Sequence, residues 1–175
     1  LEISKHFEKT YKKRFKFINQ KFSQVNNLEL NKSILKGIIF DLGYSINQIK
    51  DSEKGLSFLH KGKLNMKMGF NKISAHDVIN SFDQSSINKI LYTFGDEKKS
   101  KYIAKKIINF RKLKHIETQD LVGIIDSVYK NKFKKIHNST KVFQALRIFV
   151  NKEISELING LISSFKLIPK GGIIA

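Results

Sequence analysis

The spacing of apolar residues at the start of the chain predicts a helix followed by a strand. Ile3, Phe7 and Tyr11 recur every four residues among charged neighbours, which predicts an amphipathic helix over residues 1–14. In residues 15–19, FKFIN, apolar and polar side chains alternate. Alternation of this kind is typical of a short strand.

Two further segments predict strands of a parallel sheet. Residues 36–41, KGIIFD, hold a continuous apolar run, which predicts a parallel strand covered on both faces. Near the other end, Pro169 and two glycines form a turn signal, and residues 173–175, IIA, begin what reads as another strand. Helix and strand alternating in this way indicate the α/β class.

From about residue 70 the apolar period becomes helical. Ser74 with Asp77 predicts a capping box, and Asp83 and Thr118 predict the N-caps of two further helices. Another helix between the last two caps is indicated by one apolar face, made of Tyr102, Ile103, Ile107 and Phe110. These signals predict four short helices in succession.

The last helical pattern is the longest, and we predict one helix from about Ser139 to Lys166. A regular apolar stripe of this length is typical of a core face rather than of a cofactor site. The stripe consists of Val142, Phe143, Leu146, Phe149, Val150, Ile154, Leu157, Ile158, Leu161 and Phe165.

The charge balance points to a polyanion. The chain carries 33 Lys plus Arg against 15 Asp plus Glu, a formal net charge of +18. This excess favours nucleic acid over a membrane surface, and lysine favours phosphate contacts over reading of base edges. A solvated lysine face is the alternative for any single cluster. The clusters are Lys12, Lys13, Arg14 and Lys16; Lys98, Lys99, Lys101, Lys105 and Lys106; and Lys130, Lys132, Lys134, Lys135 and Lys141.

Other classes of protein are disfavoured by the composition. The chain has no cysteine, so disulfides and thiolate metal sites are excluded. It has no apolar run of membrane-spanning length and no signal-peptide pattern, which predicts a soluble protein of the cytoplasm. The five histidines show no paired ligand spacing, and no metal site is predicted.

The segment GIIFDLGYSINQ, residues 37–48, carries the candidate chemistry. Asp41 follows the predicted strand at the edge where open α/β sheets bind ligands, although an Asp there can also cap a turn. Gly43 allows close backbone approach, Tyr44 offers a ring for stacking, and Ser45, Asn47 and Gln48 offer uncharged hydrogen-bonding groups. Such a loop suits a planar, neutral and polar object such as a nucleobase.

Several long motifs together resemble one family. They are KGIIFDLGYSINQIKDSEKGLSF (36–58), KGKLNMKMG (61–69), FGDE (94–97) and HNSTKVFQALRIFVNKEI (137–154). In this order they are similar to the RsmH (MraW) family of 16S ribosomal RNA cytosine-N4 methyltransferases. The resemblance covers nearly the whole chain.

The resemblance implies a fold and a set of domains. We expect part of a Rossmann-like methyltransferase domain with an inserted all-α domain for substrate recognition. Residues 1–69 and 137–175 would belong to the methyltransferase core, and residues 70–136 to the insert. The family's glycine-rich loop would precede Leu1 and a further motif would follow Ala175, so the chain is expected to be a fragment that is inactive by itself.

The resemblance also implies the activity and its residues. The enzyme would use S-adenosylmethionine to methylate the N4 amine of a cytidine in 16S ribosomal RNA, free or in the small ribosomal subunit. Asp41 would be catalytic, and the cofactor contacts would be Phe22, Asp41 and Gln48. Candidate substrate contacts are Tyr44, Lys105, Lys106 and His137.

Some positions leave alternatives open. Asn65 and Gly69 replace the family's usual aspartates, so we assign no catalytic role to residues 65–69. Arg147 in the run FQALRI is either an ion-pair partner of Glu153 or another acid, or an RNA contact. The alternative for the whole chain is a non-catalytic basic helical module that binds RNA or a ribosomal surface.

Overall fold

The protein was analysed as a computed structural model that describes residues 2–45, 48–49, 51–59, 61–69, 71–129 and 136–175. The chain divides into two compact units. We call residues 41–154 the helical unit, and residues 1–40 with 155–175 the split unit.

The helical unit is built from helices that follow their predicted caps. After a 3-10 turn at Ser52–Lys54 come α3 (Ala75–Ser81), α4 (Gln84–Gly95), α5 (Ser100–Phe110), α6 (Thr118–Asp126) and α7 (Ser139–Asn151). The capping box of Ser74 and Asp77 is confirmed, and so is the Asp83 cap, which accepts a hydrogen bond from the Ser86 N–H. Both caps satisfy N–H groups that a first helical turn leaves unpaired.

The predicted cap of α6 is wrong by one residue. Glu117 is the N-cap, and its N–H donates to the Asp120 carboxylate at 3.1 Å. Thr118 instead lies buried, and its hydroxyl donates to the Gly62 carbonyl at 2.7 Å. The hydroxyl therefore joins the helix to the segment around Gly62 rather than closing the first turn.

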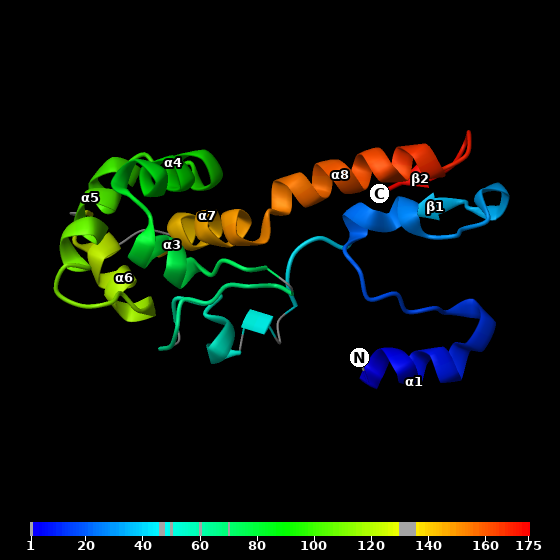
Figure 1. The fold of residues 1–175 in the computed structure, drawn as a ribbon, viewed down its shortest axis with the longest axis horizontal. Coiled ribbons are helices and arrows are strands. Elements are labelled where there is room, and N and C mark those ends of the chain that lie inside the picture. Colours follow the sequence, from blue (N-terminus) through cyan, green and yellow to red (C-terminus); the bar gives the residue numbers. More distant parts are fainter. Residues whose placement is uncertain (1, 46–47, 50, 60, 70, 130–135) are drawn as a thin grey trace. The chain divides into compact units, whose positions relative to one another are not determined.

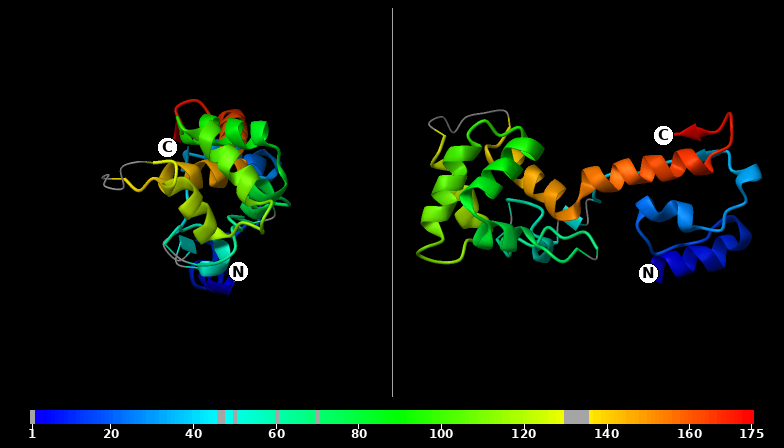
Figure 2. Two further views of the ribbon diagram at one scale, coloured as in Figure 1. Left: turned by 90° about the vertical axis from the view of Figure 1, so that its left-hand side faces the viewer. Right: turned by 45° about the horizontal axis from the view of Figure 1, so that its top comes forward.

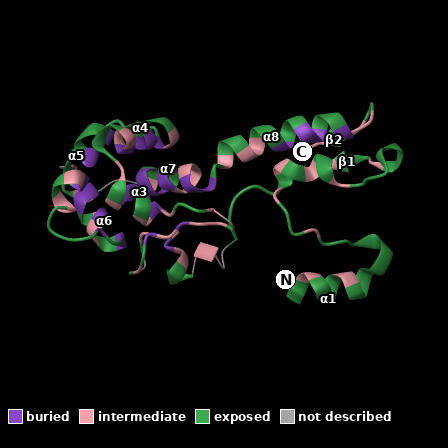
Figure 3. Ribbon diagram, viewed as in Figure 1, coloured by how far each residue is buried: buried purple, intermediate pink, exposed green. Residues whose placement is uncertain are grey.

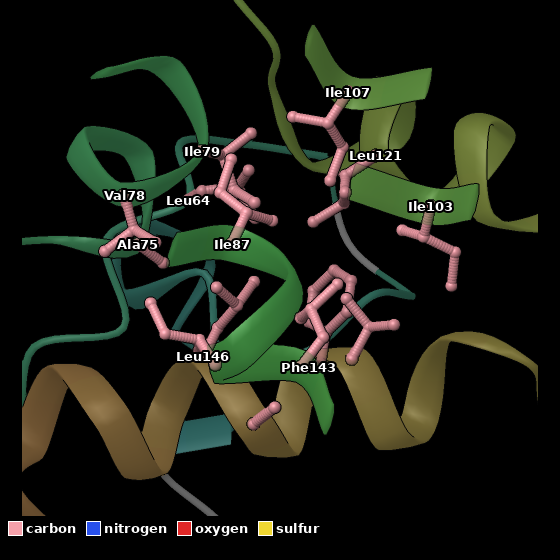
Figure 4. Close-up of a cluster of buried hydrophobic side chains, with 14 of the residues drawn as sticks. Leu64, Ala75, Val78, Ile79, Ile87, Ile103, Ile107, Leu121, Phe143 and Leu146 are labelled. Atoms are coloured by element: carbon pink, nitrogen blue, oxygen red, sulfur yellow. The ribbon is translucent and has the colours of Figure 1, made fainter. Parts of the chain in front are cut away.

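A hydrophobic core fills the helical unit. Its fully buried side chains come from helices α3 to α7 and from the connecting segments that carry Leu64, Met66 and Ile116. Figure 4 shows these side chains gathered between the helices, with Leu146 and Phe143 of α7 facing Ile87 of α4. Burial on this scale is the main source of stability for a unit of this size.

Helices α4 and α7 make the most extensive helix contact of the core. Figures 1 and 2 show α4 lying beside both α7 and α5. Gly95 ends α4 against α7, and a Cβ added there would lie 2.5 Å from the Lys141 carbonyl oxygen. The glycine thus permits the approach of the two helices.

The single long helix predicted from Ser139 to Lys166 is two helices. Lys152 has a φ of 52° and caps α7, and α8 (Glu153–Leu167) begins at the next residue. The α7 half of the apolar stripe is largely buried, as predicted. The prediction of a core face is wrong for the α8 half, where Ile154, Ile158, Leu161 and Phe165 are exposed and the buried residues are Gly160, Ser163, Ser164 and Leu167.

The split unit starts with α1 (Glu2–Tyr11), which confirms the amphipathic helix predicted there. Short 3-10 turns follow at Lys12–Arg14, Phe22–Asn27 and Lys32–Ile34. The strand predicted for residues 15–19 is wrong. Phe15 packs against Phe7 with ring centroids 6.0 Å apart, and the Phe17 N–H donates to the Glu8 carboxylate at 2.8 Å, so this segment folds back on α1 instead of joining a sheet.

Two very short strands confirm the strands predicted within residues 36–41 and 173–175, and the structure shows that they pair in parallel. β1 (Gly37–Ile38) pairs with β2 (Ile173–Ile174), and the Phe40 N–H extends the ladder to the Ala175 carbonyl at 2.7 Å. The expectation of a strand covered on both faces is wrong in the described structure, because Ile39 is 83% exposed. The chain is thus mostly helical with one small parallel sheet.

Aromatic rings hold α8 within the split unit. Phe22 and Phe40 meet edge to face, with centroids 5.5 Å apart, and both rings lie close to Gly160 of α8. Lys21 forms an ion pair with Glu156 at 2.8 Å. Among the described residues, no helix is both long and apolar enough to cross a membrane.

Candidate functional site

The candidate site is built on the loop that follows Phe40, residues 41–48. Asp41 is exposed, and no hydrogen bond or ion pair joins its carboxylate to another described residue. Gly43 has a φ of 120°, and nothing lies within 4 Å of the position of an added Cβ. A positive φ of this kind favours glycine, so the loop keeps both its backbone and its carboxylate accessible.

Gln48 closes the loop by a reciprocal pair of hydrogen bonds with Ser45. The Ser45 N–H donates to Gln48 Oε1 at 2.9 Å, and the Gln48 N–H donates to Ser45 Oγ at 3.3 Å. This reciprocal pair is the arrangement of a capping box, in which a serine and a glutamine three residues later bond each other's backbone N–H groups. Asn47, another predicted polar group of the loop, lies outside the described residues.

Tyr44 lies under the guanidinium of Arg147, whose central carbon is 4.5 Å from the ring centroid. Arg147 Nε and Nη2 donate to the two carboxylate oxygens of Glu153 at 2.9 and 3.2 Å. The Arg147 side chain is 19% exposed and that of Glu153 26%. Of the two roles considered for Arg147, the ion pair with Glu153 is confirmed. The Tyr44 contact came from no sequence signal.

Asn151 at the end of α7 is a residue that the sequence did not reveal. Its side-chain amide donates to the carbonyls of Met66 and Arg147 at 2.8 and 2.9 Å. Its oxygen accepts from the Met68 N–H at 2.7 Å and from the Asn71 side chain at 2.8 Å. The side chain is almost fully buried and all of its hydrogen-bonding groups are used, so it fixes the 66–71 segment to α7.

The 61–69 segment, KGKLNMKMG, is held in place by burial and backbone bonds. Leu64 and Met66 are fully buried, and Met66 has a φ of 56°. A non-glycine residue in this region is strained, and the surrounding contacts must hold it there. Asn65 accepts the Ala75 N–H through its carbonyl at 3.0 Å, and Gly69 has a φ of 95°. Asn65 is thus held by a backbone hydrogen bond, and the positive φ of Gly69 favours glycine at that position.

Comparison with known proteins decides the family. The model of the MraW methylase family matches residues 1–175. The chain belongs to this family. Relatives named "Ribosomal RNA small subunit methyltransferase H" include those of Neorickettsia sennetsu, 40% identical over 94% of this chain, and Ehrlichia canis, 41% identical over 91%. That of Maricaulis maris is 40% identical over 91% of this chain.

The alignment covers only part of each relative's sequence. The aligned region is 56%, 55% and 48% of these three proteins, so the chain spans about half the length of the curated relatives it matches. The family motifs quoted above fall on both the Asp41 loop and the core of the helical unit. Family membership therefore covers the structural support of the loop as well as the loop itself.

Phe22 and His137, two other predicted site residues, have different surroundings within their own units. Phe22 belongs to the split unit and is 40% exposed. His137 stacks on Phe58 with centroids 4.7 Å apart, and its Nδ1 accepts the Ser139 N–H at 3.2 Å, so it also helps to start α7. Its role as a substrate contact stays a prediction.

Among the predicted basic clusters, the α5 lysines differ in how they are held. Lys106 Nζ donates to the hydroxyl and carbonyl of Ser127 at 2.8 and 3.2 Å. Lys105, the next residue on the exposed side of α5, makes no hydrogen bond or ion pair with a described residue. Lys105 is therefore freer to meet a phosphate. Lys130, Lys132, Lys134 and Lys135 lie outside the described residues.

A buried acid at the end of α4 engages another lysine of that cluster. Glu97 is 2% exposed and accepts the Tyr129 hydroxyl at 2.6 Å and the Lys99 N–H at 2.8 Å. The Lys99 ammonium lies 4.3 Å from the centre of the Tyr129 ring. Burial, and then the Glu97 carboxylate, raise the pKa of Tyr129, so its hydroxyl stays a donor at neutral pH. In the described part of the chain, no group of three or more His, Cys, Asp or Glu residues could hold a metal ion.

Proposed function

We propose that this protein, at its natural full length, methylates the N4 amine of a cytidine in 16S ribosomal RNA with S-adenosylmethionine as donor. Membership of the MraW methylase family and the names of the relatives support this activity. The single observation that carries it is the Asp41 carboxylate, which is exposed on an open glycine loop three residues before an aromatic ring.

The proposal includes a fold for the whole enzyme. We propose that the split unit belongs to a Rossmann-like domain and that residues 70–136 form the core of an inserted helical domain. The parallel pairing of β1 with β2 supports the first part. The helical unit interrupts the split unit in sequence and has a core of its own, which supports the second. A location in the cytoplasm, with 16S ribosomal RNA or the small subunit as partner, belongs to the same proposal.

The residues of the loop fit part of the proposed cofactor. Asp41 offers two acceptor oxygens, Gln48 offers its side-chain N–H groups, and the free space at Gly43 admits close approach. Asp41 and Gln48 would hold polar parts of S-adenosylmethionine, and the family resemblance alone assigns Phe22 as a further cofactor contact. The bound cofactor supplies an electrophilic methyl group.

The main task of this chain in the proposed reaction is to orient the cytosine amine toward the methyl donor. The exocyclic amine of cytosine is a weak nucleophile, because its lone pair is delocalised into the ring. Asp41 would accept a hydrogen bond from this amine and stabilise the positive charge that grows on its nitrogen during transfer. The base must leave its stack to reach the loop, and Tyr44 offers it an aromatic surface.

One assay tests the proposed function. The full-length protein is incubated with tritiated S-adenosylmethionine and either free small-subunit RNA or assembled small subunits, and the RNA is digested to nucleosides. We expect tritium in N4-methylcytidine, at one cytidine. Tritium in another nucleoside, or none in the presence of bound RNA, would contradict the proposal.

A second candidate is a non-catalytic module that binds RNA. The closed core of the helical unit favours it, because such a unit can present lysines without the rest of an enzyme. RNA binding that falls steeply with salt, together with no methyl transfer by the full-length protein, would support this candidate instead.

A further inference from the structure

We propose that Arg147 is a positioning residue that holds the Tyr44 ring as the stacking surface for the target base, so that base, ring and guanidinium form three layers. This inference rests on the proposed function, because it concerns how that activity's substrate is placed. Its starting point is the 4.5 Å separation between the Arg147 guanidinium carbon and the Tyr44 ring centroid.

The guanidinium covers one face of Tyr44 and leaves the residue open elsewhere. Tyr44 is 41% exposed, and no ring of another described residue stacks on it. Bases stack on exposed aromatic side chains regardless of their sequence, and this stacking commonly gives single-stranded RNA its binding energy. A partly exposed ring that a guanidinium supports suits a base that has left its own stack.

Arg147 is itself held in a fixed orientation. The two hydrogen bonds to Glu153 lie in the plane of the guanidinium, so its flat face remains available to the ring. The Arg147 carbonyl accepts a hydrogen bond from Asn151, which anchors the backbone at the end of α7. Glu153 stands at the start of α8, directly after the turn at Lys152.

The distance along the chain connects this stack to the proposed chemistry. Tyr44 follows Asp41 by three residues, and three extended residues span at most about 11 Å. A base on the ring would therefore lie within reach of the Asp41 carboxylate. Holding Tyr44 still would place the amine, which is the kind of restraint that raises the rate of a transfer.

The charge of Arg147 sets this role apart from phosphate binding. Glu153 pairs with the guanidinium through both oxygens, so little net charge is left for the RNA backbone. Lysine at this position would keep the charge but lose the planar group and its fork of hydrogen bonds. A stacking support should therefore be lost in Arg147→Lys, whereas a phosphate contact should be kept.

The test uses the full-length protein and measures kcat and KM for methylation of small-subunit RNA. We expect Tyr44→Leu to lower kcat/KM by about 5- to 150-fold, the range reported for loss of one base–aromatic stack. Tyr44→Phe keeps the ring and should lose less. Arg147→Lys should lower kcat/KM by about 2- to 30-fold, as expected for a cation–π contact. Arg111→Lys is the matched control, because Arg111 binds the Ile79 and Phe82 carbonyls instead of the loop.

A double-mutant cycle separates positioning from general destabilisation. If Arg147 acts through the ring, Arg147→Lys should add little to the loss already caused by Tyr44→Leu. Independent, multiplicative losses in the double variant would overturn the proposal. So would an Arg147→Lys enzyme with wild-type kcat/KM, or one that differs from wild type only in the salt dependence of RNA affinity.

A binding measurement keeps the inference testable without turnover. RNA with pyrrolocytosine at the target position should lose fluorescence on binding, because the analogue stacks on Tyr44. The quenching should fall in Tyr44→Leu and in Arg147→Lys and stay unchanged in Arg111→Lys. Equal quenching in all variants would overturn the three-layer stack. A wild-type enzyme that quenches the probe but transfers no methyl group to unmodified RNA would contradict only the proposed function.

Discussion

The two units of the chain treat their apolar residues in opposite ways. In the helical unit, helices α3 to α7 turn their apolar faces inward around a hydrophobic core (Figure 3). In the split unit, Leu167 is the only buried hydrophobic side chain among the described residues. There the exposed apolar side chains include Ile3, Ile39, Ile158 and Phe165.

This difference shows what each unit requires. The helical unit buries a hydrophobic core and satisfies the side chain of Asn151, although side chains such as Leu59 and Leu113 remain exposed. The split unit packs its elements through small residues and aromatic edge contacts, as at Gly160, and leaves several large apolar side chains exposed.

Truncating one buried leucine should expose the difference most strongly. Leu146 is fully buried, so Leu146→Ala should lower the unfolding free energy of the 175-residue chain by about 2–5 kcal/mol. Phe165 is 79% exposed, and Phe165→Ala should change the unfolding free energy by no more than about 0.5 kcal/mol. Urea denaturation followed by circular dichroism measures both. Equal losses would show that the two units share one core.

Two glycines of the helical unit provide a finer test of its packing. Gly95→Ala places a methyl group against α7 and should cost about 1–3 kcal/mol. Gly123 of α6 has nothing within 4 Å of an added Cβ, so Gly123→Ala should stabilise the helix by about 0.5–1 kcal/mol. Thermal unfolding of the two variants should shift in opposite directions. A shift in the same direction would contradict the close approach of α4 and α7.

The smallest predicted effect concerns the cap of α3 and its pH dependence. The Ser74 hydroxyl, and then the Ser74 N–H, hold the pKa of Asp77 below its usual value. A carboxyl whose pKa is lowered in the folded state stabilises the folded protein above about pH 4. This contribution is lost as the pH falls through the folded-state pKa. Asp77→Asn should therefore be less stable than wild type at pH 7, and the difference should shrink in acid. Ser81→Ala, at the exposed end of the same helix, is the control.

Local signals predicted much of this fold. The caps at Ser74 and Asp83 and the helix over α1 depend on residues within a few positions of one another, and they were confirmed. Two strands within residues 36–41 and 173–175 were also predicted, and their pairing with each other was not. Local patterns gave wrong predictions where contacts with distant residues determine the structure. Residues 15–19 pack on α1 instead of forming a strand, and the Thr118 hydroxyl donates to the Gly62 carbonyl instead of capping α6.

The break between α7 and α8 shows another limit. Lysine rarely adopts the left-handed conformation of Lys152, so the sequence gives no warning of a helix end there. Asp41 was chosen from its place after an apolar run, and the structure leaves its role a prediction. Arg147 contacts Tyr44, and Asn151 binds the Met66 carbonyl. Both contacts join residues that are far apart in the sequence, so the periodicity of apolar residues could not predict them.

The central claim is that the Asp41 carboxylate takes part in methyl transfer. The most direct test compares kcat/KM of the full-length wild type with Asp41→Asn, which keeps the size of the side chain and removes its charge. We predict a loss of about 10²–10³-fold with unchanged thermal stability, by analogy with the loss of one group that stabilises charge in a transition state. Asp83→Asn, in which asparagine can still cap α4, should keep the wild-type rate. An Asp41→Asn enzyme that methylates cytidine at the wild-type rate would contradict the claim.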